Sequence, residues 1–600
     1  MSTIAPRHGR RSQAAGRPTL TAAVPGRVVM RILLIASAYN SLTQRVHAEL
    51  HDRGHTVAVE VTPRGPDVVA AVGRHEPDLI VAPMLKTVVP RKVWAARTCL
   101  IVHPGPVGDR GPSSLDWAVH EDAPEWGVTV LQAEEEMDAG PVWATVTFPM
   151  PQVGKSDLYR NELSDAALDA VLTAVERFAS GSWQPFDQRT SPSVPGARTR
   201  PPMRQETRRI AWADEATETV LRKLRAADSQ PGVLDELLGG EWFLHGGHTE
   251  YGLRGRPGEL LATRAGAICR ATTDGAVWIP ELRARTGAGV PRACKLPAVH
   301  ALAGRLPRLP DLPSPVLSCA DDAGWSDIRY REEGPVGVLS FSFPGGAMST
   351  DHCRRLLEAY RAACHRPTAV LVLGGARDFF SNGIHLGVIE AASDPAAESW
   401  ANINAMDDLV EAVLNTTDRL VVGAIGGNAA AGGVMLALAA DEVWCRSGSV
   451  LNPHYRRMGL YGSEYWTYSL PRRVGAATAE RLTREALPVS GASARDIGLV
   501  DRLIECPPAR FTAEVTRLAQ RWAGSPGAQS RLAAKKAEHE RREAVTPLAA
   551  VRERELARMR RIFLDPDAPY HALRRAFVRK ESAPAGPAST GAEAGERADA

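Results

Sequence analysis

Two glycine-rich turns give the clearest chemical signal in the sequence. The first spans residues 380–386 (FSNGIHL) and the second spans residues 426–433 (GGNAAAGG). Each turn follows a short apolar run and precedes a helical pattern, so free backbone N–H groups at a positive helix end face a common point. Two such N–H groups can hold the negative charge that develops on a carbonyl oxygen. The turns therefore predict a site that polarises the carbonyl of an acyl group such as a thioester.

A histidine and an aspartate far upstream predict a second site. His103 closes an apolar run and is followed at once by Pro104 and Gly105, while Asp138 precedes Ala139 and Gly140 in a turn. A histidine at the carboxyl edge of a sheet, with a carboxylate nearby, can take a proton from an attacking nucleophile and stabilise a tetrahedral intermediate. We therefore expect acyl-transfer chemistry here.

Size and composition allow several cores and give no global electrostatic case for a polyanionic partner. The 600 residues are 44% hydrophobic and carry a formal net charge of +3, with the basic residues spread along the chain. We therefore expect small-molecule substrates and neither nucleic acid nor membrane as a partner. The eight cysteines are scattered without a metal-binding spacing, which predicts reduced thiols, no metal site and a cytoplasmic protein.

The order of apolar runs and helical patterns predicts an α/β protein of several domains. Apolar strands from Met30 onward alternate with helical patterns as in a Rossmann-like, parallel, doubly wound sheet. A Pro- and Arg-rich linker and then short apolar runs between glycine turns predict a small β-barrel-like (OB-like) domain, before a third, α/β domain with C-terminal helices. The expected divisions are 1–29 (flexible extension), 30–195, 196–310, 320–580 and 581–600 (disordered tail).

The N-terminal part resembles the N10-formyltetrahydrofolate-dependent formyltransferases. The resemblance rests on residues 101–105 (IVHPG), 111–115 (GPSSL), 127–129 (GVT) and 137–140 (MDAG). It implies a Rossmann-like catalytic domain, a small β domain and N10-formyltetrahydrofolate as the formyl donor. His103 and Asp138 occupy two of the three catalytic places of the family. Ile101 stands where the family has an asparagine, and its side chain cannot donate a hydrogen bond to the formyl oxygen.

The same resemblance implies where the folate would bind. Pro83, Met84 and Leu85 match the position of the loop that cradles the pterin through its backbone. Three polar residues lie in segments expected to face this cleft and to suit a folate glutamate or a phosphate, namely Gln44, Arg160 and Ser229.

The two glycine-rich turns resemble those of the crotonase (enoyl-CoA hydratase/isomerase) superfamily. The resemblance implies that the N–H groups of Ile384 and Gly432 form an oxyanion hole for a coenzyme A thioester. Met435 stands at the first of the two glutamate positions of the hydratases and cannot carry a proton. Proton transfer is therefore assigned to Tyr455 and Glu464, with His454 as a further candidate.

Two arginines are expected to meet the phosphates of coenzyme A, namely Arg484 and Arg579.

Longer strings resemble the HypX (HoxX) family of hydrogenase maturation factors. They are residues 39–45 (YNSLTQR), 108–117 (GDRGPSSLDW), 451–455 (LNPHY) and 461–466 (YGSEYW). That resemblance implies formyl transfer to coenzyme A, decarbonylation of formyl-CoA to carbon monoxide, and partnership with the maturation machinery of a [NiFe]-hydrogenase. Two alternatives stay open: formyl transfer to an amine with a regulatory CoA-binding domain, and a non-catalytic assembly scaffold.

Overall fold

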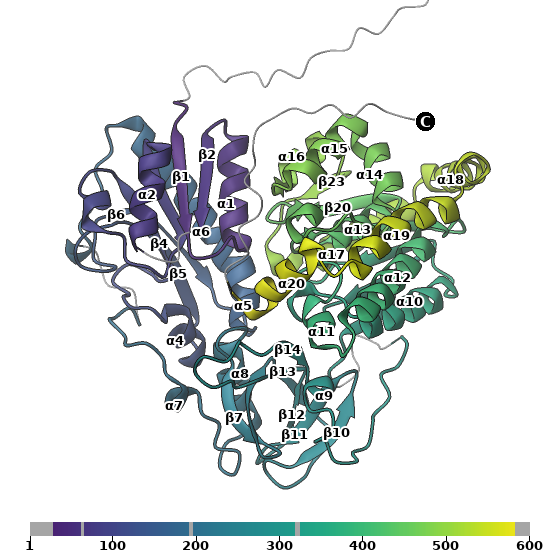
Figure 1. The fold of residues 1–600 in the computed structure, drawn as a ribbon, viewed down its shortest axis with the longest axis horizontal. Coiled ribbons are helices and arrows are strands. Elements are labelled where there is room, and N and C mark those ends of the chain that lie inside the picture. Colours follow the sequence, from purple (N-terminus) through teal and green to yellow (C-terminus); the bar gives the residue numbers. More distant parts are fainter. Residues whose placement is uncertain (1–27, 62–64, 191–195, 318–323, 582–600) are drawn as a thin grey trace, which may run out of the picture.

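The computed structural model describes residues 28–61, 65–190, 196–317 and 324–581. The expected flexible extension up to Arg27 and the expected disordered tail from Ser582 onward lie outside the described residues. Three parts lie side by side in Figure 1: an N-terminal α/β part, a β-rich part below it, and a larger C-terminal α/β part opposite.

The N-terminal part is built on a six-stranded sheet in the order β2-β1-β3-β4-β5-β6. Strands β1 to β4 pair in parallel, as expected for a doubly wound sheet, whereas β5 and β6 are antiparallel, which was not predicted. Hydrophobic clusters place α1 and α6 against one face, and α2 and α3 against the other. The elements are β1 (Arg31–Ala36), α1 (Ser41–Asp52), β2 (Thr56–Val61), α2 (Gly65–His75), β3 (Leu79–Met84), α3 (Arg91–Trp94), β4 (Cys99–His103), α4 (Ser114–His120), β5 (Glu125–Gln132), β6 (Val142–Pro149), α5 (Lys155–Leu158), the π-helical turn η1 (Tyr159–Leu163) and α6 (Ser164–Ser180).

The β-rich part contains two four-stranded antiparallel sheets, with orders β10-β11-β12-β9 and β14-β13-β8-β7, rather than one closed barrel. Both contribute to a core that includes Val277, Leu282 and the apolar face of α8. The elements are α7 (Gln205–Arg208), α8 (Thr217–Ala227), β7 (Val233–Leu237), β8 (Gly240–His245), β9 (His248–Glu250), β10 (Leu260–Arg264), β11 (Ala267–Ala271), β12 (Ala276–Ile279), β13 (Glu281–Ala284), β14 (Lys295–Pro297) and α9 (Ala298–Ala301).

The C-terminal part is built on a sheet in the order β15-β16-β17-β18-β20-β23, which is parallel from β16 onward. Helices α10, α12, α13 and α19 share a core with one face, while α17 covers the other. Its strands are β15 (Ile328–Glu333), β16 (Val336–Phe341), β17 (Val370–Gly374), β18 (Leu420–Ile425), β20 (Glu442–Arg446) and β23 (Arg502–Ile504), with a small sheet of β19 (Ala429–Ala430), β21 (Val450–Asn452) and β22 (Val489–Ser490).

The helices of this part make up most of its C-terminal half. They are α10 (Thr350–Cys364), α11 (Leu386–Ala391), α12 (Pro395–Leu414), α13 (Gly432–Leu438), the short 3-10 helix η4 (Tyr455–Met458), α14 (Trp466–Val474), α15 (Ala476–Glu485), α16 (Gly491–Asp496), α17 (Phe511–Ala523), α18 (Pro526–Val545), α19 (Leu548–Leu564) and α20 (Pro569–Arg579). The last helix, α20, runs back to the middle of the molecule, where the three parts meet (Figure 1).

Ion pairs join the first and third parts. Arg446 on β20 bonds Asp165 on α6 at 3.0 Å. Arg377, just after β17, bonds Asp157 on α5 at 2.9 Å and Glu162 on η1 at 2.6 Å. These contacts lie between segments more than 200 residues apart in the chain, so the two α/β parts face each other at a fixed orientation.

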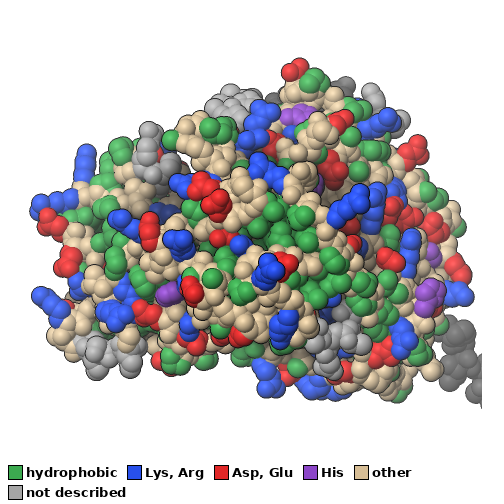
Figure 2. All heavy atoms as spheres, turned by 90° about the horizontal axis from the view of Figure 1, so that it is seen from below, with side chains coloured by type: hydrophobic (Ala, Val, Ile, Leu, Met, Phe, Trp, Pro, Cys, Tyr) green, Lys and Arg blue, Asp and Glu red, His purple; other side chains and the backbone are tan. Residues whose placement is uncertain are grey.

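The exposed surface carries charges of both signs. On the face seen from below, Lys and Arg side chains alternate with Asp and Glu, around a central group of hydrophobic side chains (Figure 2). Within the described ranges, every helix is too short or too polar for a membrane span. The same residues hold no group of three or more His, Cys, Asp and Glu side chains arranged to bind a metal ion.

Candidate active sites

The two glycine-rich turns lie side by side and are hydrogen-bonded to each other. Phe380 N donates to Asn428 O at 3.0 Å, and Ala430 N donates to Ser381 O at 2.8 Å. A Cβ atom on Gly383 would lie 3.2 Å from the backbone nitrogen of Gly432. The structure thus brings the turn that contains Ile384 against the start of α13, as the spacing predicts.

The amides assigned to the oxyanion hole belong to these adjoining segments. Gly432 is the first residue of α13, so its N–H has no acceptor within the helix. Among the described residues, neither Gly432 N nor Ile384 N donates a hydrogen bond to another protein group. Both amides are therefore free to bind a ligand oxygen.

The carboxyl group of Glu464 lies against Gly432, the residue that carries one of the two assigned N–H donors. A Cβ atom on Gly432 would stand only 2.1 Å from Glu464 Oε1, so this glycine is required by close approach. Glu464 is 1% exposed, and it and Tyr465 both have left-handed backbone conformations, with φ of 57° and 59°. An acid–base group and the oxyanion donors therefore share one buried site.

Tyr455 completes this group. Its hydroxyl donates to Glu464 Oε2 at 2.9 Å, and Ser463 N donates to the same oxygen at 3.0 Å. Burial, with Asp407 as the second contribution, raises the pKa of Glu464 to about 8. Burial also raises the pKa of Tyr455 well above its usual value. Near neutral pH, therefore, the Glu464 carboxyl can both accept and donate a proton.

His454 lies beside this group in a defined tautomer. Its Nδ1 bonds the Asn452 carbonyl at 2.9 Å, and burial lowers the pKa of the imidazole. A neutral ring with Nδ1–H donating to that carbonyl leaves Nε2 as an acceptor. Arg457, on the 3-10 helix η4 that follows His454, places its guanidinium carbon 5.2 Å from the centre of the Tyr39 ring.

Met435, at the first glutamate position of the hydratases, is fully buried in the core.

The upstream histidine lies between two carboxylates. His103 Nε2 is 3.0 Å from Asp109 Oδ2, and His103 Nδ1 is 3.5 Å from Asp138 Oδ1. Burial acts to lower the pKa of His103, but the hydrogen bonds and charges of these two partners prevail and raise it to about 9. Burial likewise acts to raise the pKa of Asp138, and the His103 imidazolium prevails and lowers it. The two carboxylates therefore favour the charged form of the His103 imidazole.

The surroundings of His103 are held tightly. Asp109 is bonded by Arg200 at 2.9 Å, and Asp138 Oδ2 accepts from Gly111 N at 3.1 Å. A Cβ atom on Gly105 would lie 2.4 Å from Asp109 Oδ2 and 2.6 Å from His103 Nε2, so only glycine fits there.

The residues assigned to folate binding lie in different surroundings. Pro83 and Met84 end β3, Leu85 follows, and Met84 O accepts from Ser37 N at 2.8 Å, so the three lie at the carboxyl edge of the sheet. Gln44 on α1 donates to Tyr39 O at 3.0 Å.

Ser229, and Ile101 at the position where the formyltransferase family has an asparagine, can also be located. Ser229 follows α8 and is partly exposed. Ile101 lies in β4, where it packs with the hydrophobic cluster under α2 and α3. Its side chain therefore belongs to the core beside His103.

Arg160 is placed differently from the expectation of an anion ligand. Its guanidinium forms two parallel hydrogen bonds with Asp378, at 2.8 and 2.9 Å, across the boundary between the two α/β parts. It also lies over the ring of Phe379 at 4.5 Å. Asp378 and Phe379 come just before the first glycine-rich turn, so Arg160 supports that turn from the N-terminal part.

The two arginines assigned to coenzyme A lie in different surroundings. Arg484 is exposed on α15 and pairs with Glu480 of the same helix at 3.7 Å, so its binding to coenzyme A stays a prediction. Arg579 ends α20 and bonds the buried Glu390 at 3.2 Å. Next to it, burial lowers the pKa of Lys580, and Arg292 and Lys295 lower it further by their charge.

Several residues around the sites were not assigned from the sequence. Asp109 stands inside one of the family-like strings, so its position could have suggested a role. Arg200 lies in the Pro- and Arg-rich segment that was expected to be a linker. Asp407 lies in the middle of helix α12, where no local sequence pattern indicates a functional role.

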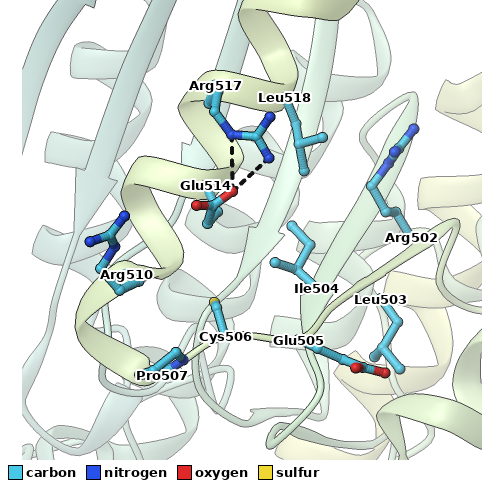
Figure 3. Close-up of a pocket in the computed structure, with 10 residues that line it drawn as sticks. All are labelled: Arg502, Leu503, Ile504, Glu505, Cys506, Pro507, Arg510, Glu514, Arg517 and Leu518. Carbon is cyan, nitrogen blue, oxygen red and sulfur yellow. Dashed lines mark hydrogen bonds and ion pairs between the residues drawn. The ribbon is translucent and has the colours of Figure 1, made fainter.

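A cavity of about 600 Å³ opens elsewhere, between β23 and the start of α17 (Figure 3). Cys506, Arg510 and Glu514 are among its lining residues, and Glu514 is paired with Arg517 at 2.7 Å. It contains none of the residues assigned to either site.

Two family profiles match the chain. The profile of the formyl transferase C-terminal domain covers residues 202–291, and that of enoyl-CoA hydratase/isomerase covers residues 344–568. The chain is also 26% identical to methionyl-tRNA formyltransferase of Trichlorobacter lovleyi, over 38% of this chain and 72% of that protein.

Two relatives match almost the whole length. Hydrogenase maturation factor HoxX of Bradyrhizobium diazoefficiens is 49% identical over 92% of this chain and 95% of that protein. The crystal structure of HypX from Aquifex aeolicus in complex with tetrahydrofolic acid is 42% identical, covers 92% of this chain and 96% of that one, and superposes with a TM-score of 0.88. Since identity and fold both extend over nearly the full chain, this protein belongs to the HypX (HoxX) family of hydrogenase maturation factors.

Proposed function

We propose that this protein makes carbon monoxide in two steps, in the cytoplasm, for the assembly of a [NiFe]-hydrogenase active site. The first site transfers the formyl group of N10-formyltetrahydrofolate to the thiol of coenzyme A. The second site decarbonylates the resulting formyl-CoA to carbon monoxide and free coenzyme A. The observation that carries the proposal is the carboxyl group of Glu464 lying against Gly432 in the oxyanion hole.

In the first step a C–S bond forms, the bond between the formyl carbon and N10 breaks, and one proton passes from sulfur to N10. The His103 imidazolium donates a proton to the leaving N10, and the thiol proton passes through the Asp138 carboxylate, which contacts His103, and restores the imidazolium. Because Ile101 offers no donor, the charged imidazole of His103 also stabilises the oxyanion of the tetrahedral intermediate. Two features support this assignment: His103 lies at the carboxyl edge of the sheet, and its pKa is raised to about 9.

In the second step the substrate limits the chemistry. A formyl group has no α-carbon, so enolisation and hydration are both excluded, and loss of carbon monoxide remains. The formyl proton passes to Glu464, the C–S bond breaks, and the thiolate receives the proton back, which balances formyl-CoA against carbon monoxide and coenzyme A. The N–H groups of Ile384 and Gly432 hold the carbonyl oxygen, and Tyr455 hydrogen-bonds the carboxyl.

A cluster of cations supports binding of the coenzyme A phosphates beside this site. Burial, followed by the charge of Arg292, lowers the pKa of Arg283 to about 10. Burial, followed by the charges of Arg292 and Lys295, likewise lowers the pKa of Lys580. Such mutual repulsion is relieved when a phosphate binds among the cations. Strand β14, which begins at Lys295, contacts α11, the helix that follows the first glycine-rich turn.

The test uses purified full-length protein with N10-formyltetrahydrofolate labelled with ¹³C in the formyl group, with and without coenzyme A. We expect labelled carbon monoxide, trapped on deoxygenated haem, only when coenzyme A is present. Formyl transfer to an amine without coenzyme A would favour the amine-formyltransferase alternative. Absence of any turnover would favour the scaffold.

A further inference from the structure

A buried aspartate on α12 contacts the segment that carries Glu464. Asp407 has no exposed surface and lies in the middle of that helix. Ser463 Oγ lies 2.9 and 2.8 Å from the two carboxylate oxygens and shares its one proton between them, and Glu464 N donates to Asp407 Oδ1 at 2.8 Å. Asp407 thus binds the side chain of Ser463 and the backbone N–H of Glu464, the residue that carries the catalytic carboxyl group.

This contact falls where the backbone needs support. Glu464 and Tyr465 are consecutive non-glycine residues in the left-handed region, a conformation that L-residues adopt at a cost in free energy. The turn they form directs the Glu464 side chain back onto Gly432. The hydrogen bonds that Ser463 Oγ and Glu464 N donate to Asp407 offset that cost and also satisfy the buried carboxylate.

We propose that Asp407 is a positioning residue for the decarbonylation step: it holds the Ser463–Tyr465 turn so that the Glu464 carboxyl lies over the oxyanion hole, and it places a negative charge close to that carboxyl. The inference rests on the proposed function, since it deepens the role of the same site.

The charged groups around this pair are few. From α12, Asp408 lies beside Asp407, and from α19, Arg552 Nε approaches Asp407 at 4.0 Å while Glu555 raises the pKa of Glu464. The hydroxyl of Tyr455 on η4 and the thiol of Cys353 on α10 face Glu464 from the other sides. Burial raises the pKa of Asp407 to about 7, and burial followed by Asp407 raises that of Glu464 to about 8. Removing the charge at Asp407 must therefore lower the pKa of Glu464.

Two substitutions separate the two roles. Asp407→Asn keeps an acceptor for the turn but removes the charge, whereas Asp407→Leu removes both at similar volume. The matched control is Asp408→Asn, because Asp408 is the next residue on the same helix but is about half exposed and pairs with Arg552 at 2.6 Å. Consumption of formyl-folate at the first site shows in each variant that the chain is folded.

The measurement is the rate of carbon monoxide release from added formyl-CoA between pH 5.5 and 10, on the full-length protein. We expect the rising limb of the wild-type profile to move by about one pH unit to lower pH in Asp407→Asn. In Asp407→Leu we expect kcat to fall by about a hundredfold with little change in KM. Asp408→Asn is expected to keep the wild-type profile.

The outcomes distinguish this inference from the proposed function. If the wild-type protein releases no carbon monoxide from formyl-CoA, the proposed function fails. If it does so, a limb of Asp407→Asn that coincides with that of the wild type overturns the effect of the Asp407 charge, and an unchanged kcat in Asp407→Leu overturns the positioning role. Should Asp407→Leu fail to fold, the profile of Asp407→Asn decides alone.

Discussion

Glu464 Oε1 occupies the space into which any side chain on Gly432 would extend, because a Cβ atom there would stand 2.1 Å away. Gly432→Ala should therefore displace the Glu464 carboxyl from the oxyanion hole. We expect at least a hundredfold loss of carbon monoxide release from formyl-CoA, since small displacements of a reacting group are costly. Formyl transfer from folate at the other site should stay within about twofold of wild type, because no contact of His103 changes. The measurement is each half-reaction assayed separately.

A matched control for this substitution is Gly527→Ala. Gly527 lies on α18, where a Cβ atom would meet nothing within 4 Å. Both half-reactions should be unchanged in this variant. Full carbon monoxide release by Gly432→Ala would show that Glu464 does not act at the oxyanion hole.

Glu464→Gln tests the proton transfer itself. The amide keeps the size of the side chain and can still contact Tyr455, but it cannot accept the formyl proton, so we expect formyl-CoA to accumulate and carbon monoxide to be absent. In the wild type the rate should rise with pH through about 8, because the base must be ionised and its pKa is raised to that value. Tyr455→Phe removes one hydrogen bond to the carboxylate, which should raise the pH of this limb's midpoint. The sign follows from the bond, which stabilises the ionised form, so its loss raises the pKa of Glu464 and moves the limb to higher pH.

The residues that backbone geometry fixes could be predicted from the sequence. The turns at 380–386 and 426–433 combine glycines with apolar runs before them, and the structure brings them together as the pattern predicts. His103 follows the same logic, because the end of a buried strand marks the carboxyl edge of a sheet.

Contacts between distant segments could not be predicted in this way. Arg160 was assigned to an anion by its charge, but a local pattern cannot show that Asp378, 218 residues away, takes its guanidinium. The antiparallel β5 and β6 were missed for a similar reason, since strand direction depends on connections rather than on apolar content. Asp407 looks like any helical aspartate until its burial is known.

The pH dependence of formyl transfer follows from the carboxylates around His103. If the charged imidazole stabilises the tetrahedral intermediate, the rate should fall as the pH rises through about 9, the pKa to which its partners raise it. In Asp138→Asn one of those charges is lost, so the pKa of His103 falls and the descending limb should move to lower pH. The measurement is formyl-folate consumption with coenzyme A against pH. Asp122→Asn, at an exposed turn, serves as the control, and an unmoved limb in Asp138→Asn would contradict the assignment.

The cation cluster predicts which arginine matters for coenzyme A. Arg292→Glu should raise the KM for coenzyme A by about tenfold or more and leave the KM for formyl-folate unchanged, because it places a negative charge among the groups expected to meet the phosphates. Arg484→Glu is the matched comparison, since Arg484 is exposed and pairs, within the described part of the chain, with Glu480 and Glu485 of its own helix. Initial rates at varied coenzyme A measure both. Equal effects of the two substitutions would place the phosphates elsewhere.

The ion pair between Arg160 and Asp378 links the two α/β parts at the base of the first glycine-rich turn. Both side chains are about four-fifths buried, so Arg160→Ala leaves a largely buried carboxylate with only the bond from Phe379 N. We expect a loss of about 2 kcal/mol in the free energy of unfolding, between the values typical of exposed and of fully buried pairs. Thermal unfolding should show a lower Tm, whereas Arg189→Ala, which breaks an exposed pair with Asp187, should leave it unchanged. If Arg160 instead binds folate directly, its substitution would raise the KM for formyl-folate at unchanged stability, so measuring both quantities on the same variant separates support of the turn from ligand binding.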